Sequence, residues 1–418
     1  MAYAITQNCC NDASCVSVCP VNCIHPTPDE PGFGSTELLY VDPKACIDCG
    51  ACADACPVNA IFPIDRLLGP DTVYAELNRQ YYTEHPTDTA WSVPHFPRSF
   101  SADIGAVRVA VIGTGPAACY AAESLLRIGA EVTMLDRQPV PGGLIRFGVA
   151  PDHPSTKKIG DSFAGLFQHP RLRMHLNVEV GKDVTHADIA AHHHAVIYAV
   201  GAAADKTLPT STARRSTGTV LRRRADGSSS ASCPRRPSCS VSSTSSLSRW
   251  AATPSEERLA SRQRGSTTYS PHDSSLRSTG YRGRPIPDLP FDPATATVPN
   301  HAGRVVDPEQ GERVTGTYVV GWIKRGPSGG IGTNRTCAAE TVDALLDDAN
   351  GRELLHPVGS ARDFARLVRR RKPHAVGKRE VLAIDQAERA RGDEAGRPRV
   401  KFATAHDLIA AGKGLQRS

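Results

Sequence analysis

The sequence predicts an α/β protein in which a doubly wound, Rossmann-like domain follows a small α+β domain and is interrupted by a low-complexity, disordered insert. Two features predict the ordered parts. Strand, glycine-turn, helix and strand patterns follow one another between Arg108 and Asp136. Nine of the 13 cysteines lie in the first 56 residues. With 418 residues, the chain is long enough for two or three domains.

Four cysteines in one short run predict an iron–sulfur cluster. The spacing C-x2-C-x2-C-x3-C-P is formed by Cys46, Cys49, Cys52 and Cys56. Three closely spaced thiolates can bind three irons of a cubane, and the fourth cysteine binds the other cluster in proteins with two clusters. A zinc site also uses four cysteines, but zinc favours two separated pairs. The spacing therefore favours a cluster.

A second run supplies ligands for another cluster, with one change. Cys9, Cys15 and Cys19 fit the pattern, but Asp12 stands where the middle cysteine is expected. This first cluster is therefore either a three-iron [3Fe-4S] form or a [4Fe-4S] form whose fourth iron binds Asp12 or water. Cys10 is a competing ligand. The resemblance to seven-iron ferredoxins favours the three-iron form.

The last cysteine of each run is expected to cross to the other cluster. Cys23 fits neither set and is expected to be a buried thiol near a cluster. The predicted ligands are Cys9, Cys15 and Cys56 for the first cluster, and Cys19, Cys46, Cys49 and Cys52 for the second, which is a [4Fe-4S] cluster. We assign residues 1–65 to a two-cluster ferredoxin domain. Residues 66–104, which contain several prolines, are expected to form an extended linker along the next domain.

Residues 105–204 contain a dinucleotide-binding fingerprint. Gly113, Gly115 and Ala118 have the spacing G-x-G-x-x-G/A after an apolar strand. The first glycine permits a tight turn, the second lets the backbone approach a pyrophosphate, and the alanine lets helix and strand pack closely. The carboxylate of Asp136 is placed to bind a ribose hydroxyl. A buried strand–turn–helix without a ligand is the alternative, but the glycine-rich polar loop at residues 139–154 argues against it.

With this loop, the chain resembles the adrenodoxin reductase-like family of flavoprotein ferredoxin–NADP reductases, in the actinobacterial form with a ferredoxin fused in front. In that family the first dinucleotide fold binds FAD. The pattern resumes at residues 278–350, where the stretch GTYVVGWIKRGPSGGIGTN precedes a predicted helix at residues 336–346. The resemblance implies FAD contacts at Gly113, Gly115, Ala117, Ala118, Asp136, Gly143, Leu144, Val180, Gly201, Trp322, Gly329, Gly330 and Ile331.

The resemblance also implies one catalytic residue and a path for electrons. His153 is expected near the reacting nicotinamide; the alternative is a histidine that orders its loop. Trp322 is likewise either a flavin neighbour or a core residue. NADPH would reduce FAD, which converts two-electron to one-electron chemistry and passes electrons through the clusters to ferredoxin or another one-electron protein carrier.

Residues 205–277 depart from the family pattern. Residues 211–250 contain 13 serines and 8 arginines, a composition that cannot bury a core. The family has its NADP-binding domain here, but no second glycine fingerprint follows Gly115. We interpret the segment as a degenerate remnant left by a deletion or a shifted reading frame, with a genuine disordered insert as the alternative. Two further functions therefore stay open: an NADPH-independent electron-transfer flavo-iron–sulfur protein, and an inactive gene product.

Composition limits the partners and the location. The net charge of +6 is too small to indicate nucleic acid, and no apolar run is long enough to cross a membrane. The N-terminus lacks a signal peptide, so we expect a cytoplasmic protein. The adjacent histidines 192–194 cannot all face one metal ion and are expected to be solvated. Residues 351–418 form a basic C-terminal extension, whose Arg369–Lys372 run is expected on a solvated face or docking surface.

Overall fold

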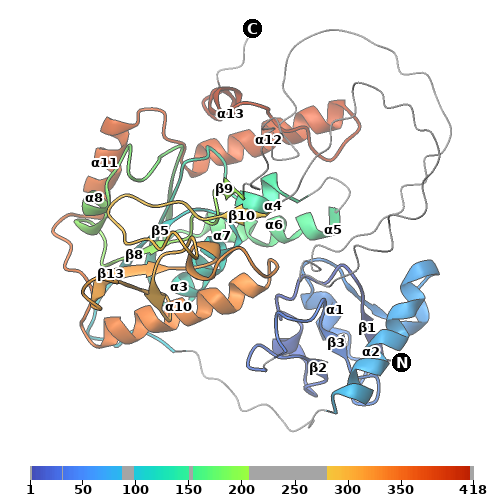
Figure 1. The fold of residues 1–418 in the computed structure, drawn as a ribbon. Coiled ribbons are helices and arrows are strands. Elements are labelled where there is room, and N and C mark those ends of the chain that lie inside the picture. Colours follow the sequence, from blue (N-terminus) through green and yellow to red (C-terminus); the bar gives the residue numbers. More distant parts are fainter. Residues whose placement is uncertain (1, 31, 87–97, 150–153, 207–279, 415–418) are drawn as a thin grey trace, which may run out of the picture. The chain divides into compact units, whose positions relative to one another are not determined.

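The computed structural model describes residues 2–30, 32–86, 98–149, 154–206 and 280–414 (Figure 1). The described residues belong to one compact unit, Met1–Thr207 with Gly280–Ser418. His153 and nearly all of the expected insert lie outside the described residues. None of the described helices is long and apolar enough to span a bilayer.

The cysteine-rich module is built from two short antiparallel ribbons. β1 (Tyr3–Ile5) pairs with β4 (Ile61–Pro63), and β2 (Ile24–His25) pairs with β3 (Tyr40–Val41). The 3-10 helix η1 (Val16–Val18) lies within the first cysteine run, and the short helix α1 (Ala51–Ala55) lies within the second. Both runs are therefore held by loops and short helices between the ribbons.

The prediction of an extended linker at residues 66–104 is wrong for its first half. The 3-10 helices η2 (Ile64–Arg66) and η3 (Gly69–Thr72) lead into helix α2 (Val73–Glu84). The buried Asn78 side chain accepts hydrogen bonds from the amides of Ile5 (3.1 Å) and Val41 (2.8 Å), and thereby joins both ribbons. Proline at the start of η3 is compatible with a helix, because its missing N–H would be unpaired there anyway.

Seven strands form the main sheet in the order β11-β12-β13-β8-β5-β6-β7. They are β5 (Arg108–Ile112), β6 (Glu131–Asp136), β7 (Leu172–Leu176), β8 (Ala195–Tyr198), β11 (Asn300–His301), β12 (Arg304–Val306) and β13 (Arg313–Val319). Strands β13, β8, β5, β6 and β7 are parallel, and β12 and β11 continue the sheet in antiparallel fashion. β6 and β8 flank β5 on opposite sides, the arrangement at which doubly wound sheets bind ligands beyond the carboxyl ends of their strands.

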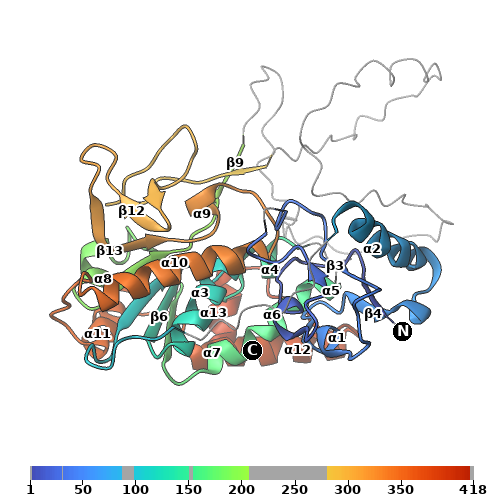
Figure 2. The same ribbon diagram turned by 90° about the horizontal axis from the view of Figure 1, so that it is seen from below.

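Both faces of the sheet are covered, which explains the continuous apolar run in β5. Val109 and Val111 belong to the core beneath α3 (Pro116–Arg127) and α10 (Thr333–Asn350), two helices that lie side by side (Figure 2). Ala110 and Ile112 belong to the opposite core, with residues of α8 (His186–Ala190) and α11 (Ala361–Arg371). The doubly wound α/β fold predicted from the sequence is thus confirmed.

Three short helices lie between the glycine-rich loop and β7. They are α5 (Pro154–Lys157), α6 (Ile159–Ser162) and α7 (Ala164–Gln168). Gly160 and Gly165 lie in this stretch, and glycine costs a helix about 1 kcal/mol relative to alanine. The helix predicted at residues 336–346 is the longer α10, which begins at Thr333 and ends at Asn350.

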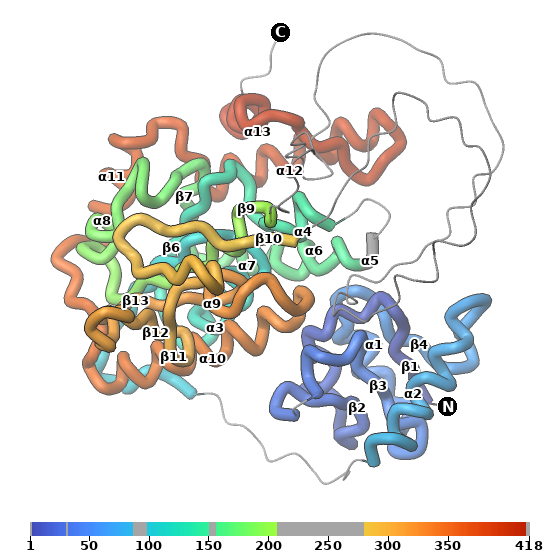
Figure 3. Tube along the Cα trace, in the orientation of Figure 1, coloured from blue at the N-terminus to red at the C-terminus, as the bar shows by residue number. Residues whose placement is uncertain are grey.

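The chain leaves and re-enters the sheet domain at one place. β9 (Ala204–Asp205) pairs in antiparallel fashion with β10 (Tyr281–Arg282) (Figure 3). Residues 206 and 280 are also joined, because the Lys206 amide donates to the Gly280 carbonyl at 2.9 Å. A segment between these points can therefore vary in length without disturbing the order of the main sheet.

The C-terminal segment contains three further helices, and its residues form ion pairs with the sheet domain. Helices α11, α12 (Lys378–Glu394) and α13 (Ala405–Gly412) follow α10. Arg371 pairs with Asp188 at 2.5 Å, and Lys372 pairs with Asp183 at 3.0 Å. Arg371 and Lys372 are therefore paired within the chain, while Arg369, Arg370 and Arg371 are exposed, as expected for a solvated face.

The prediction that histidines 192–194 are solvated is wrong for His193. Its side chain is fully buried, and its ring nitrogens lie 2.9 Å from the Ile189 carbonyl and 3.0 Å from the Thr133 hydroxyl. Nδ1 of His194 accepts a hydrogen bond from the Arg108 amide at 3.0 Å. His193 and His194 therefore contact residues of the sheet through their side chains.

Acid should destabilise the fold through His193. Burial lowers the pKa of His193 from 6.5 to about 4. A folded-state pKa below the unfolded value means that the stabilisation is complete above about pH 6.5 and is lost as the pH falls toward 4. The loss is about 1.4 kcal/mol per pH unit within this window. We expect urea unfolding to show this slope and His193→Gln to reduce it; an unchanged slope in the variant would contradict the assignment.

Candidate functional site

The glycine turn after β5 has one position that only glycine fits and one that faces open space. Gly113 has φ +115°, and a Cβ there would lie 2.5 Å from the Ala199 carbonyl oxygen. Gly115 is extended and begins α3, and a Cβ there would meet no atom within 4 Å. The first glycine is required by the fold. The second leaves space in front of the helix.

The start of α3 can bind an anion. No side chain caps this helix, so its first amides have no side-chain acceptor. Ala117 and Ala118 are buried, and Gly321 packs so closely that a Cβ would lie 2.7 Å from that of Ala117. The amides and the helix dipole together favour a phosphate in the space beside Gly115.

Asp136 ends β6 beside this turn. Its carboxylate accepts hydrogen bonds from the Thr114 hydroxyl at 2.6 Å and from the Gln138 amide at 2.8 Å. Burial raises the pKa of Asp136, and these two hydrogen bonds oppose that shift. The side chain is therefore held in one orientation next to the glycine turn, as a ribose-binding carboxylate requires.

The glycine-rich loop after β6 closes over the same turn. The Gly142 amide donates to the Thr114 carbonyl at 3.0 Å. Gly143 has φ +48°, and a Cβ there would lie 2.7 Å from the Cα atom of Gly115. Leu144 follows with 39% of its surface exposed. The structure thus brings together residues from two loops that the sequence assigned to one site.

The remaining predicted contacts lie after other strands of the sheet. Gly201 follows β8, has φ +68° and faces open space. Val180, beyond β7, forms a bridge with Val184 and packs against the core.

The turn between β13 and α10 contains the other predicted contacts. Trp322 begins the short helix α9 (Trp322–Arg325), and its Nε1 donates to the Ser328 carbonyl at 3.0 Å. The indole is half-buried, so it is not a fully buried core residue. Arg325 donates to the Asn334 amide oxygen at 3.1 Å, while its buried Nε has no partner among the described residues. Gly329, Gly330 and Ile331 lie between these residues and α10.

These features fit a dinucleotide cofactor. The turn offers open space beside Gly115, uncapped amides at the start of α3 and a carboxylate at Asp136. Two buried guanidinium nitrogens, Nε of Arg146 and Nε of Arg325, are unpaired in the described part of the chain. His153, the predicted catalytic residue, lies outside the described residues.

The cysteines border two separate cavities. The first is lined by Cys9, Cys10, Asp12, Cys15 and Cys56 together with apolar side chains. The second is lined by Cys19, Cys23, Cys46, Cys49 and Cys52. Cys56, from the second cysteine run, therefore borders the first cavity, and Cys19, from the first run, borders the second cavity. This is the arrangement that two clusters sharing two cysteine runs require.

Each cavity is lined by several cysteines, the ligands of iron–sulfur clusters. Among the described residues, no three His, Cys, Asp or Glu side chains are placed to hold one metal ion. A cluster holds its thiolates apart around a core, whereas a single ion draws its ligands to one point. Burial raises the pKa of the Cys9 thiol to about 11, so metal binding there must displace a proton.

Two residues near these cavities bear on the ligand set. The Sγ atom of Cys23 lies 3.4 Å from that of Cys19, which agrees with the expected thiol near a cluster. The Asp12 carboxylate accepts hydrogen bonds from the Ser14 amide at 3.2 Å and from the Ser14 hydroxyl at 2.5 Å. It also lies 3.5 Å from Arg335. Asp12 is therefore already committed to other partners.

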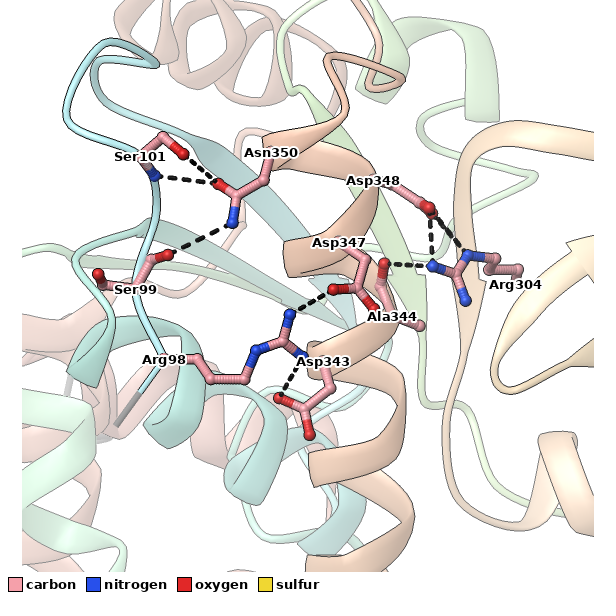
Figure 4. Close-up of polar contacts among 9 residues, drawn as sticks. All are labelled: Arg98, Ser99, Ser101, Arg304, Asp343, Ala344, Asp347, Asp348 and Asn350. Atoms are coloured by element: carbon pink, nitrogen blue, oxygen red, sulfur yellow. Dashed lines mark hydrogen bonds and ion pairs between the residues drawn. The ribbon is translucent and has the colours of Figure 1, made fainter. Parts of the chain in front are cut away.

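Helix α10 is anchored at its far end. Arg98 pairs with Asp347, and the amide of Ser101 donates to the Asn350 side chain at 3.0 Å (Figure 4). Arg304 forms a two-pronged ion pair with Asp348. These contacts fix the helix whose first residues follow the turn at residues 329–331. Residues 98–101 lie along the sheet domain, as predicted for this part of the linker.

One anchor of the site was not evident from the sequence. Glu388 of α12 is fully buried, and both of its oxygens lie 2.7 Å from Arg146 Nη2. Arg399 donates to it at 2.9 Å, and the Phe402 amide donates at 3.1 Å. Arg146 belongs to α4 (Gly143–Phe147), the short helix that begins in the glycine-rich loop. The C-terminal helices therefore hold that loop in place.

Replacing Glu388 with alanine should destabilise the fold by roughly 3–5 kcal/mol, because two partly buried guanidinium groups lose their partner. Urea unfolding measures the change. The matched control is Arg389→Ala, which removes an exposed pair with Asp385 on the same helix. That variant should lose less than about 1 kcal/mol. Equal losses in the two variants would show that Glu388 is not the anchor.

Two segments of the chain match known protein families. Residues 39–62 match the 4Fe-4S binding domain, and residues 111–176 match the NAD(P)-binding Rossmann-like domain. The chain is 37% identical to a probable ferredoxin/ferredoxin–NADP reductase of Mycobacterium tuberculosis, over 98% of this chain and 95% of that protein. The alignment extends over 545 residues although this chain has 418, so it contains long gaps opposite residues of the relative.

Other relatives match about three quarters of this chain. NADPH-ferredoxin reductase FprA of Mycobacterium leprae is 28% identical over 73% of this chain and 98% of its own length. The solved structure of Mycobacterium tuberculosis FprA in complex with NADPH is 26% identical and matches with a TM-score of 0.55. It covers 74% of this chain and 100% of that chain.

Proposed function

This chain belongs to the ferredoxin/ferredoxin–NADP reductase family, and we propose that it passes electrons from NADPH through FAD to two iron–sulfur clusters and on to ferredoxin or another one-electron protein carrier. It is an oxidoreductase. One observation supports the proposal above the others: a dinucleotide cradle and two cysteine-lined cavities occur in the same compact unit. FAD, when bound, supplies the conversion of two-electron to one-electron chemistry.

We assign the cradle around Gly115 to FAD. The amides at the start of α3 bind the pyrophosphate, and Asp136 binds a ribose hydroxyl. The turn of Trp322 and residues 329–331 lies beside the flavin, where the start of α10 favours negative charge on the reduced ring. Ala117, Ala118, Gly143, Leu144, Val180 and Gly201 are the other proposed FAD contacts. His153 is the proposed catalytic residue next to the nicotinamide.

We assign the two cavities to the two clusters. Cys9, Cys15 and Cys56 bind the first, and the proposal favours a [3Fe-4S] form because Asp12 is already bound to Ser14 and Arg335. Cys19, Cys46, Cys49 and Cys52 bind the second, a [4Fe-4S] cluster. We propose that the cluster domain extends through α2 and that the described residues of 98–206 and 280–414 form the FAD domain.

A second function, electron transfer without NADPH, is favoured by one observation. The sequence has no second glycine fingerprint beyond Gly115, and the alignment with the relatives contains long gaps. The pairing of β9 with β10 allows a domain between them to be reduced without loss of the main sheet. In that case reduced ferredoxin, rather than NADPH, would be the electron donor.

Steady-state reduction of added ferredoxin tests the proposal. The holoprotein should reduce ferredoxin with NADPH, lose this activity when FAD is removed, and regain it when FAD is restored. Protein that reduces no ferredoxin with NADPH, but whose flavin is bleached by reduced ferredoxin, would favour the second function. Purified protein that contains no flavin would contradict both proposed functions.

A further inference from the structure

The loop that borders the first cavity touches the turn before α10. The Gly332 amide donates a hydrogen bond to the Cys10 carbonyl at 2.9 Å. A Cβ built on Gly332 would overlap the backbone of Asn11 and Asp12, so the two backbones meet where there is no room for a side chain. This contact joins residues that are more than 300 positions apart in sequence.

An ion pair reinforces this contact. Arg335, one turn into α10, lies 3.5 Å from the carboxylate of Asp12 and donates to the Ser14 hydroxyl at 2.5 Å. Asp12 is 7% exposed, and the Arg335 guanidinium also lies 5.9 Å from the ring centroid of Tyr120 on α3. Leaving a nearly buried carboxylate without its cation costs free energy. The ion pair therefore holds the loop of Asp12 in one position.

The second cavity differs in its exposure. Cys49, which borders it, is exposed, and Ile47 between the first two cysteines is 59% exposed. Cys15 on the first cavity is buried, and Cys9, Cys10 and Cys56 are only partly accessible. An exposed apolar side chain beside a redox centre is the kind of surface on which a partner protein can dock.

We propose that the loop of residues 9–15 docks on residues 332–335 and makes the Cys9–Cys15–Cys56 cavity the entry point for electrons from the flavin domain. The Cys19–Cys46–Cys49–Cys52 cavity is then the exit toward the external carrier. One electron moves at each step, and no covalent bond forms or breaks. This order rests on the proposed function, and it adds the direction in which electrons pass between the two clusters.

Light-driven reduction of the flavin in the full-length holoprotein tests the order. The flavin is photoreduced without NADPH, and cluster spectra are recorded by freeze-quenched electron paramagnetic resonance. Cys49→Ala, which damages the second cluster, should leave reduction of the first at the wild-type rate. Cys56→Ala, which damages the first, should slow reduction of the second at least about tenfold, a factor that corresponds to about 1.4 kcal/mol. The opposite pattern would overturn the proposal.

A second pair of variants tests the docking contact without touching a cysteine. Arg335→Glu should raise hydrogen–deuterium exchange in residues 9–15 and slow the first cluster's reduction roughly tenfold, the factor given by about 1.4 kcal/mol of lost docking energy. The control Arg127→Glu changes an exposed arginine paired with Glu123 on α3 and should do neither. Unchanged exchange and rate in Arg335→Glu would overturn the docking proposal. Because no NADPH is used, a failure here is distinct from a failure of NADPH oxidation.

Discussion

Replacing Gly115 with valine should abolish FAD binding while leaving the apoprotein as stable as the wild type. Gly115 has ordinary extended backbone angles, and a Cβ there meets no protein atom within 4 Å. A side chain that begins there points into the space assigned to the pyrophosphate. We expect the flavin content of the purified variant to fall below about one hundredth of the wild-type value, the result of losing roughly 3 kcal/mol or more of binding energy.

Gly113→Ala is the matched control for this experiment. At Gly113 the backbone has φ +115° and a Cβ would lie 2.5 Å from the Ala199 carbonyl. This variant should lose several kcal/mol of unfolding free energy, roughly 2–4, because the strained turn must rearrange. Thermal unfolding of both apoproteins separates the two effects. A Gly115→Val variant that retains flavin would show that the cofactor does not lie against this turn.

Each of the variants Cys56→Ala and Cys19→Ala should remove the cluster whose other ligands come from the other cysteine run. Cys56 follows the second cysteine run but borders the first cavity, and Cys19 ends the first run but borders the second cavity. Cys56→Ala should therefore lose the first cluster and keep the [4Fe-4S] signal, and Cys19→Ala should do the reverse. Iron content and electron paramagnetic resonance of anaerobically purified protein measure the outcome.

Cys23→Ala is the control for the cysteine variants. Cys23 lines the second cavity and lies 3.4 Å from Cys19, but it is not among the proposed ligands. Both clusters should survive this change. If Cys56→Ala instead removed the second cluster and spared the first, the crossed assignment would be wrong, and each run would bind its own cluster.

Features that depend on a local pattern of residues could be predicted from the sequence. The strand–turn–helix–strand unit from Arg108 to Asp136 was predicted because its apolar run, glycine spacing and terminal carboxylate are all local signals. The two cavities group the cysteines as the crossing rule predicts, although iron ligation by these residues remains a prediction. Local spacing was informative here because the cofactors require closely spaced ligands.

Features that depend on distant contacts were missed. Glu388 is one acidic residue in a charged helix, and its partner Arg146 lies 242 positions away. Asn78 was assigned to a linker, although its amide group is what joins two ribbons of the cluster domain. His193 was expected in solvent because three adjacent histidines cannot all face one metal ion, yet the fold buries it against Thr133. In each case the tertiary partner, and not the local pattern, decides the role.

The most direct test of the account is an anaerobic titration of the purified holoprotein with NADPH, followed by dithionite on the same sample. The account predicts that the flavin absorbance bleaches at modest NADPH concentrations and that the cluster absorbance then decreases. Dithionite should add little further reduction of the flavin. Bleaching by dithionite alone would contradict NADPH as the electron donor and identify a flavin and cluster protein that takes its electrons from another carrier.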